Sequence, residues 1–165
     1  MTCVIGIDIG TTSTIGVLLD TKKNKILKKK SINVNLFSIK EGWAEEDPNQ
    51  WWLNTKKIIK ELSKTAKSKK KKIIAIGTTG MLPALVILDK KGKVIRRSIQ
   101  QSDSRTAKQL KKIFNKKNSS SFIKTTRCGI NQQLIAPKLI WLKENERNNF
   151  NKIYKIMGSY DYINY

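Results

Sequence analysis

The segment from Val4 to Leu19 places one acidic residue and a short polar turn between two runs of β-branched residues. Such runs are typical of strands, and Gly10 permits a tight turn that joins them as an antiparallel pair. Asp8 interrupts the first run, where a buried carboxylate is costly unless a cation or hydrogen-bond donors compensate it. We therefore predict a buried strand, a turn and a second strand, with Asp8 as a ligand for a metal ion.

The predicted turn consists of Gly10, Thr11, Thr12 and Ser13. Successive backbone N–H groups in a tight turn can converge on an anion, so these residues predict a phosphate-binding turn. This turn differs from a P-loop, which leads into a helix and has a G-x-x-x-x-G-K-[ST] spacing that the chain lacks. The alternative is an ordinary polar β-turn without a ligand.

Charge and composition argue against several other functions. The net charge is +22, with 29 lysines and 5 arginines. Specific nucleic-acid readers use arginine and exposed aromatic residues, which are not gathered here, so we expect only weak and salt-sensitive adhesion to nucleic acid. No apolar stretch approaches a membrane span, and no signal peptide is evident. Cys3 and Cys128, without any histidine, do not provide a zinc site, and we expect reduced thiols in a cytoplasmic protein.

The periodicity of apolar residues predicts an α/β chain. The predicted strands span residues 4–9, 14–19, 25–32, 73–76, 83–88 and 94–98, and the predicted helices span residues 47–67, 104–117 and 132–145. Asp47 is the expected N-cap of the first helix, with Pro48 at its first position and Gln50 at the capping-box position. We expect a solvated loop at residues 67–72 and a serine-rich link at residues 118–121.

Three antiparallel strands, a crossover helix and a further strand are the opening of the ribonuclease-H-like fold of actin, hexokinase and sugar kinases. Several blocks of sequence then resemble the N-terminal domain of the FGGY carbohydrate kinases, most closely the xylulokinase branch. The blocks are residues 6–13, 42–52, 77–89, 101–105, 136–146 and 158–163. The resemblance implies a kinase that phosphorylates a hydroxyl group of a sugar or polyol, with ATP and Mg²⁺ as cofactors.

The resemblance also implies roles for individual residues near the N-terminus. Asp8 matches the aspartate that positions the cation, and the residues from Gly10 to Ser13 match the turn that faces the γ-phosphate. Met81 and Leu82 occupy the family's sugar-contacting turn. This chain departs from the xylulokinase pattern there, because Leu82 and Pro83 replace a Met-His pair and a histidine contact to the sugar is lost.

Asp103 and Arg105 match the family's W-x-D-x-R segment, in which the aspartate hydrogen-bonds sugar hydroxyl groups. The alternative is that Asp103 is a charge at a helix N-terminus and Arg105 is a surface cation. Helix capping and aromatic packing are sufficient to explain the block at residues 42–52, without a role in binding.

Members of the FGGY family are longer than this chain. The resemblance implies that residues 1–165 form part of the N-terminal domain, and that the general base and the adenosine-binding domain lie beyond the C-terminus. The chain is then a truncated or split kinase, inactive alone, for which a separately encoded C-terminal half is one conceivable partner. The alternatives are a non-catalytic fragment or actin-like binding module and, from charge alone, a basic nucleic-acid-binding domain.

Overall fold

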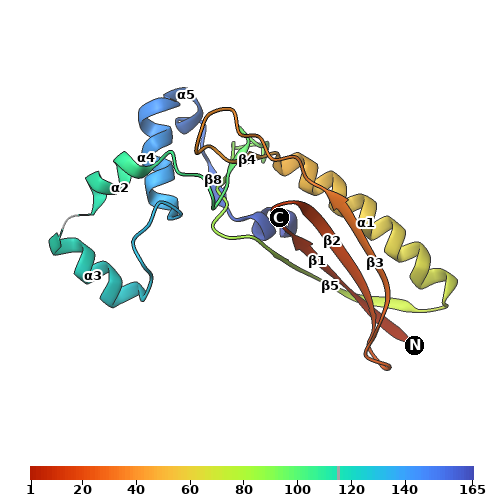
Figure 1. Ribbon diagram of the computed structural model, residues 1–165. Helices are drawn as coiled ribbons and strands as arrows, with labels where there is room; N and C mark the ends of the chain where they lie inside the picture. Colours follow the sequence, from red (N-terminus) through yellow and green to blue (C-terminus); the bar gives the residue numbers. More distant parts are fainter. Residues whose placement is uncertain (115) are drawn as a thin grey trace. The chain divides into compact units, whose positions relative to one another are not determined.

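The computed structural model describes residues 1–114 and 116–165, which form two compact units (Figure 1). The chain passes from one unit to the other more than once, so neither unit is a continuous stretch of sequence. Unit 1 comprises Met1–Leu36, Asp47–Leu82 and Gly158–Tyr165, and unit 2 comprises Phe37–Glu46 and Pro83–Met157.

Unit 1 is built on a four-stranded sheet in the order β3-β2-β1-β5. Its strands are β1 (Thr2–Ile9), β2 (Ser13–Asp20), β3 (Lys25–Asn33) and β5 (Lys72–Gly80). The first three strands form an antiparallel meander, and β5 pairs with β1 in parallel after the crossover helix α1 (Pro48–Ser68). The predicted α/β order of elements is confirmed, and β5 continues beyond its predicted end at Ile76.

Strand β1 is fully buried on one face only. Cys3, Ile5, Ile7 and Ile9 are at most 1% exposed, whereas the residues that alternate with them are half-buried. Asp8 belongs to the half-buried set, so the prediction that its side chain is enclosed in a buried strand is wrong. Side chains of a strand alternate between its two faces, and a β-branched run conceals this alternation when one face is only partly covered.

Helix α1 begins as predicted. The side chain of its N-cap, Asp47, accepts a hydrogen bond from the backbone N–H of Asn49 at 2.9 Å, and Pro48 is the first helical residue. Gln50 does not complete a capping box. Its Oε1 instead accepts a hydrogen bond from the N–H of Asn35 at 3.0 Å, which ties the helix to the segment after β3.

Gly16 in β2 allows α1 to lie close against the sheet. A Cβ atom at this position would lie 2.2 Å from Cγ2 of Ile58 and 3.2 Å from Cδ1 of Leu62. We expect Gly16→Ala to lower the free energy of unfolding by about 1 to 3 kcal/mol, because the helix must shift away from the sheet. Gly77→Ala is the matched control, since a Cβ there meets no atom within 4 Å. Urea unfolding of both variants tests the difference, and equal losses would contradict this packing.

The lysine run at residues 67–72 is not entirely a solvated loop. Nζ of Lys71 lies 2.7 Å from a carboxylate oxygen of Asp20, and both side chains are at most 8% exposed. Asp20 also accepts hydrogen bonds from the N–H groups of Lys22 and Lys23, each at 3.0 Å. The bond from Lys71, followed by that from Lys23, lowers the pKa of Asp20 from its ordinary value of 3.8 to about 2.

This pKa predicts acid sensitivity in unit 1. Because the folded-state pKa lies below the unfolded one, the contribution of Asp20 to stability is fully present above pH 3.8 and is lost as the pH falls to about 2. We expect Asp20→Asn to be less stable than wild type at neutral pH, with a gap that narrows through this acidic range. Urea unfolding midpoints of both proteins, measured across this acidic range, test the prediction. A stability difference that does not change with pH would show that the ion pair of Asp20 with Lys71 does not cause it.

Unit 2 contains two short antiparallel strand pairs. Strand β4 (Glu45–Glu46) pairs with β7 (Ser98–Ile99), and β6 (Val86–Leu88) pairs with β8 (Lys155–Met157). The predicted hairpin between residues 83–88 and 94–98 is reduced to one isolated bridge, between Leu88 and Val94. Strand β6 takes a partner far along the sequence instead, which local patterning cannot indicate because pairing is decided by tertiary contacts.

The remaining helices are short. They are α2 (Ala107–Ile113), α3 (Lys116–Thr126), α4 (Ile135–Asn145) and α5 (Arg147–Phe150) in unit 2, and α6 (Ser159–Asn164) in unit 1. The predicted helix at residues 104–117 thus ends early, and residue 115 within it lies outside the described residues. The predicted link at 118–121 is helical, since serine costs a helix little. In the described chain no helix is long and apolar enough to cross a membrane.

The core of unit 2 is aromatic and aliphatic. Its fully packed members are Leu85, Ile87, Ile99, Trp141 and Leu142. Leu85 directly precedes β6, and the others come from β6, β7 and α4, so this core joins the short strands to α4. The indole rings of Trp43 and Trp141 meet edge to face, with their centroids 5.4 Å apart.

Candidate functional site

The turn between β1 and β2 runs from Gly10 to Ser13 and is held at two points. The N–H of Gly10 donates to the carbonyl of Ser13 at 3.0 Å, and the N–H of Val34 donates to the carbonyl of Thr12 at 2.9 Å. A Cβ at Gly10 would lie 3.0 Å from the Ser13 carbonyl oxygen, so this closed turn favours glycine. The turn is therefore a fixed element at the end of β1.

Two backbone donors of this turn remain free. The N–H groups of Thr11 and Thr12, which lie between β1 and β2, have no acceptor in the part of the chain that the structure describes. Thr11 and Thr12 are exposed, and Ser13 is half-buried. Free N–H groups in a tight turn can bind the oxygen atoms of a phosphate, which fits the predicted role of the turn.

Asp8 lies just before the turn, on the half-buried face of the sheet. Among residues 1–114 and 116–165, its carboxylate has neither a hydrogen-bond donor nor a salt-bridge partner. The same residues contain no cluster of three or more histidine, cysteine or acidic side chains that could hold a metal ion. A single carboxylate fits Mg²⁺, which keeps several of its waters and is completed by substrate phosphates.

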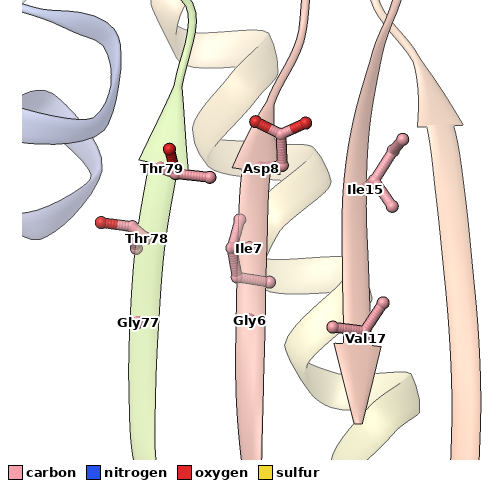
Figure 2. Close-up of a pocket in the computed structure, with 8 residues that line it drawn as sticks. All are labelled: Gly6, Ile7, Asp8, Ile15, Val17, Gly77, Thr78 and Thr79. Atoms are coloured by element: carbon pink, nitrogen blue, oxygen red, sulfur yellow. The ribbon is translucent and has the colours of Figure 1, made fainter. Parts of the chain in front are cut away.

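An open hollow lies on the sheet face that carries Asp8, and Figure 2 shows the residues that line it. Its volume is about 340 Å³. Gly6 and Gly77 are paired across β1 and β5 and leave its middle without side chains. Asp8 and Thr79 lie at the ends of the same two strands, and β2 contributes an apolar wall (Figure 2). The complete lining is Gly6, Ile7, Asp8, Ile15, Val17, Gly77, Thr78 and Thr79.

Met81 and Leu82 directly follow β5. The N–H of Met81 donates to the carbonyl of Ile9 at 2.9 Å, and its own carbonyl accepts a hydrogen bond from Oγ of Ser159 at 2.8 Å. The structure therefore places Met81 next to the end of the strand that carries Asp8. Leu82 is 46% exposed and accessible to a ligand. Contact of either residue with a sugar stays a prediction.

Asp103 and Arg105 are buried in unit 2, so their alternative interpretation as a helix-terminal charge and a surface cation is wrong. One Asp103 oxygen accepts hydrogen bonds from N and Nε of Arg105, at 3.0 and 2.8 Å. The other accepts from the N–H of Ala44 and from the Arg105 guanidinium, both at 2.7 Å. Contact between Asp103 and a sugar stays a prediction, and it requires the exchange of one of these bonds.

Arg105 is the centre of a buried cluster. Its guanidinium carbon lies 3.7 Å from the ring centroid of Trp43 and 4.9 Å from that of Trp141. It also donates to Glu45 at 2.8 Å. Glu45 is shared with Arg96, which continues the cluster to Glu146 at 3.1 Å. The aromatic packing predicted for residues 42–52 is confirmed. Arg96 belongs to no motif, and Glu146 ends the block at residues 136–146, but neither was predicted to join this cluster.

Lys138 in α4 is a buried residue that the motif analysis did not single out. Its side chain is 0% exposed, and Nζ donates to the carbonyls of Gln100 at 2.9 Å and Pro83 at 3.1 Å. Burial lowers the pKa of Lys138 to about 8. The spacing of Lys138, Trp141 and Leu142 is that of one helix face and would have indicated its inward position.

The predicted site residues fall into two groups. Asp8, the turn from Gly10 to Ser13, Met81 and Leu82 belong to unit 1, where the sheet brings them to the ends of β1 and β5. Asp103 and Arg105 belong to unit 2, in a cluster of charged and aromatic side chains.

The fold defines the class of protein as the actin-like, ribonuclease-H-like α/β class that includes the sugar kinases. The xylulose kinase structure from Rhodospirillum rubrum matches with a TM-score of 0.93 and 43% identity, over 98% of this chain and 34% of that chain. The glycerol kinase structure from Plasmodium falciparum with ADP matches with a TM-score of 0.91 and 25% identity, over 99% of this chain and 33% of that chain.

The chain belongs to the FGGY family of carbohydrate kinases, because the model of the family's N-terminal domain matches residues 3–165. Among curated proteins, the xylulose kinase of Staphylococcus xylosus is 32% identical over 165 residues, which are 100% of this chain and 34% of that protein. This chain thus spans about a third of the length of the curated relatives that it matches.

Proposed function

We propose that this chain is the phosphate- and cation-binding portion of an ATP-dependent kinase that phosphorylates a hydroxyl group of a sugar or polyol. One observation carries the proposal: a carboxylate without a partner at Asp8 lies beside a turn in which the N–H groups of Thr11 and Thr12 are free. Phosphoryl transfer depends on positioned phosphates and on a cation that neutralises their charge. The xylulose kinases among the relatives make a ketopentose the first substrate to test.

Within this proposal, each group in unit 1 has a distinct role. Asp8 holds a hydrated Mg²⁺, which when bound neutralises charge on the phosphate oxygens. The N–H groups from Thr11 to Ser13 bind the terminal phosphate of ATP. The solved glycerol kinase with ADP is a relative of the same fold whose structure contains a nucleotide, which supports this assignment.

Two groups of residues are proposed to contact the sugar, each within its own unit: Met81 and Leu82 after β5 in unit 1, and Asp103 and Arg105 in unit 2. Hydrogen bonds at both the N–H and the carbonyl of Met81 hold its backbone in place. Asp103 has both oxygens occupied by Arg105 and Ala44, so a sugar hydroxyl would replace one of these donors.

We assign no general base to this chain. We propose that residues 1–165 are part of the N-terminal domain, and that the base and the adenosine-binding domain come from sequence corresponding to the uncovered two thirds of the relatives. A separately encoded C-terminal half is one way to supply the base and the adenosine-binding domain. The free thiols Cys3 and Cys128 fit the cytoplasmic location that we propose for an ATP-consuming enzyme.

A chimaeric enzyme tests the proposed function. This chain replaces the aligned first third of the Rhodospirillum rubrum xylulose kinase, of which it covers 34%. We expect the chimaera to consume ATP in the presence of a pentulose, pentitol or glycerol, whereas the isolated chain does not exceed background because it lacks a base. A coupled assay for ADP measures both.

The remaining two thirds of the Rhodospirillum enzyme, without any first third, is the control and should be inactive. Activity of the isolated chain would contradict the assignment of the base to another segment. A chimaera that folds and binds Mg–ATP but phosphorylates none of these acceptors would contradict the proposed reaction.

A further inference from the structure

The end of β5 presents a hydroxyl group beside Asp8. The parallel register pairs Asp8 with Thr79, so both side chains project from the same face of the sheet. Figure 2 shows the Asp8 carboxylate and the Thr79 hydroxyl at the ends of neighbouring strands. Thr79 is exposed, and its hydroxyl has no hydrogen-bond partner within residues 1–114 and 116–165.

The backbone fixes this end of β5 against β1. Directly after the strand, the N–H of Met81 donates to the carbonyl of Ile9, and Oγ of Ser159 donates to the carbonyl of Met81. A Cβ at Gly80 would lie 2.6 Å from Oγ of Ser159 and 3.0 Å from Cβ of Ile9, so the chain is in close contact here. The backbone at Thr79 is therefore held against the end of β1 that carries Asp8, as the backbone of a ligand-binding group requires.

The space next to Thr79 is large enough for a hydrated ion. The hollow measures about 340 Å³, and the six waters of an octahedral Mg²⁺ occupy about 180 Å³ at the volume of liquid water. Gly77 leaves the β5 side of the hollow open. A Cβ at this position would meet no atom within 4 Å, so packing does not explain why the residue is glycine. Glycine weakens a strand, and where the chain itself gives no packing reason it often marks the approach of a ligand.

We infer that Thr79 is a second cation-positioning residue, whose hydroxyl accepts a hydrogen bond from a water of the divalent cation held at Asp8. This inference depends on the proposed function, because it uses the cation site of Asp8. Thr78 is the natural comparison within the same strand. It pairs with Ile7 on the opposite face, and its hydroxyl is buried without a hydrogen-bond partner in the described chain.

The test measures binding of Mn²⁺–tripolyphosphate to the isotopically labelled chain by NMR, at a salt concentration that screens the surface lysines. Paramagnetic broadening should affect the amides of Asp8, the turn from Gly10 to Ser13, and Thr79. We expect Thr79→Val to weaken this binding about three- to tenfold, as the loss of one hydrogen bond does. Metal-free tripolyphosphate should bind Thr79→Val and wild type equally, since the hydroxyl is assigned to the cation.

Two variants make the result specific. Thr78→Val removes a hydroxyl from the opposite face of β5 and should bind as wild type. Thr79→Ser keeps the hydroxyl and should also bind as wild type, which tests the inference even if the valine variant does not fold. Equal weakening in Thr78→Val and Thr79→Val, or weakening in Thr79→Ser, would overturn the inference.

Asp8→Asn separates this inference from the proposed function. If Asp8→Asn loses binding while Thr79→Val keeps it, Thr79 has no part in the site, but the proposed cation site at Asp8 stands. If Asp8→Asn binds Mn²⁺–tripolyphosphate as wild type does, the proposed cation site is wrong, and the inference about Thr79 is wrong with it.

Discussion

A fall in kcat of about a hundredfold is expected when Asp8 is replaced by asparagine in the chimaeric kinase. Asparagine keeps the size and shape of the side chain but removes the charge that holds the hydrated cation. The sugar KM should change much less, because Asp8 is assigned to the phosphate side and not to the sugar. Steady-state kinetics with ATP and sugar varied separately measure both constants.

Asp47→Asn is the matched control for this experiment. It makes the same carboxylate-to-amide change in unit 1, at the N-cap of α1, where asparagine caps a helix as well as aspartate does. We expect its kcat to match that of the unsubstituted chimaera. If Asp8→Asn is folded and turns over at the same rate as this control, Asp8 is an ordinary residue of strand β1 and binds no cation.

Lys138→Met should lower the free energy of unfolding by about 2 to 4 kcal/mol at neutral pH. Methionine retains the unbranched apolar part of the side chain but cannot donate hydrogen bonds. The carbonyls of Pro83 and Gln100 then lose the buried donor that Lys138 supplies at 3.1 and 2.9 Å. Urea unfolding followed by tryptophan fluorescence reports on this region, since Trp141 lies in the core of unit 2.

The same substitution at Lys143 is the control, because this residue is exposed on the same helix α4 and should change stability by less than about 0.5 kcal/mol. The pH dependence gives a second test. The folded-state pKa of Lys138 is about 8, below its ordinary value of 10.5, so wild type gains stability as the pH rises between these values. The gap between wild type and Lys138→Met should therefore widen over this range, and a narrowing gap would contradict the buried position of the ammonium.

The strands and helix of unit 1 could be predicted because their signals are local. β-Branched runs, a glycine turn and the Asp47–Pro48 helix start lie within a few residues of the elements that they specify. Unit 2 was predicted less well, because its strands are only two or three residues long. Strand β6 pairs with β8, far along the chain, and no pattern of hydrophobic residues indicates such a partner.

The candidate site shows the same division. The polar turn and its neighbouring aspartate are contiguous in sequence, so the spacing alone predicted a phosphate and metal site there. The parallel pairing that brings Thr79 beside Asp8 depends on the crossover through α1 and was not predicted. The partners of Asp103 and Arg105 also come from distant segments, which is why two residues interpreted as sugar contacts or surface charges are found in a buried cluster.

The sequence by itself determined the family, the α/β class, the first three strands with their crossover helix, and the turn from Gly10 to Ser13. These features depend on short-range patterns and on motifs. Only the tertiary structure decided which charges are buried and what compensates them, as for Asp20 with Lys71 and for Lys138 with three backbone carbonyls. The physical reason is that the cost of burying a charge depends on all the groups packed around it, and those groups come from distant parts of the chain.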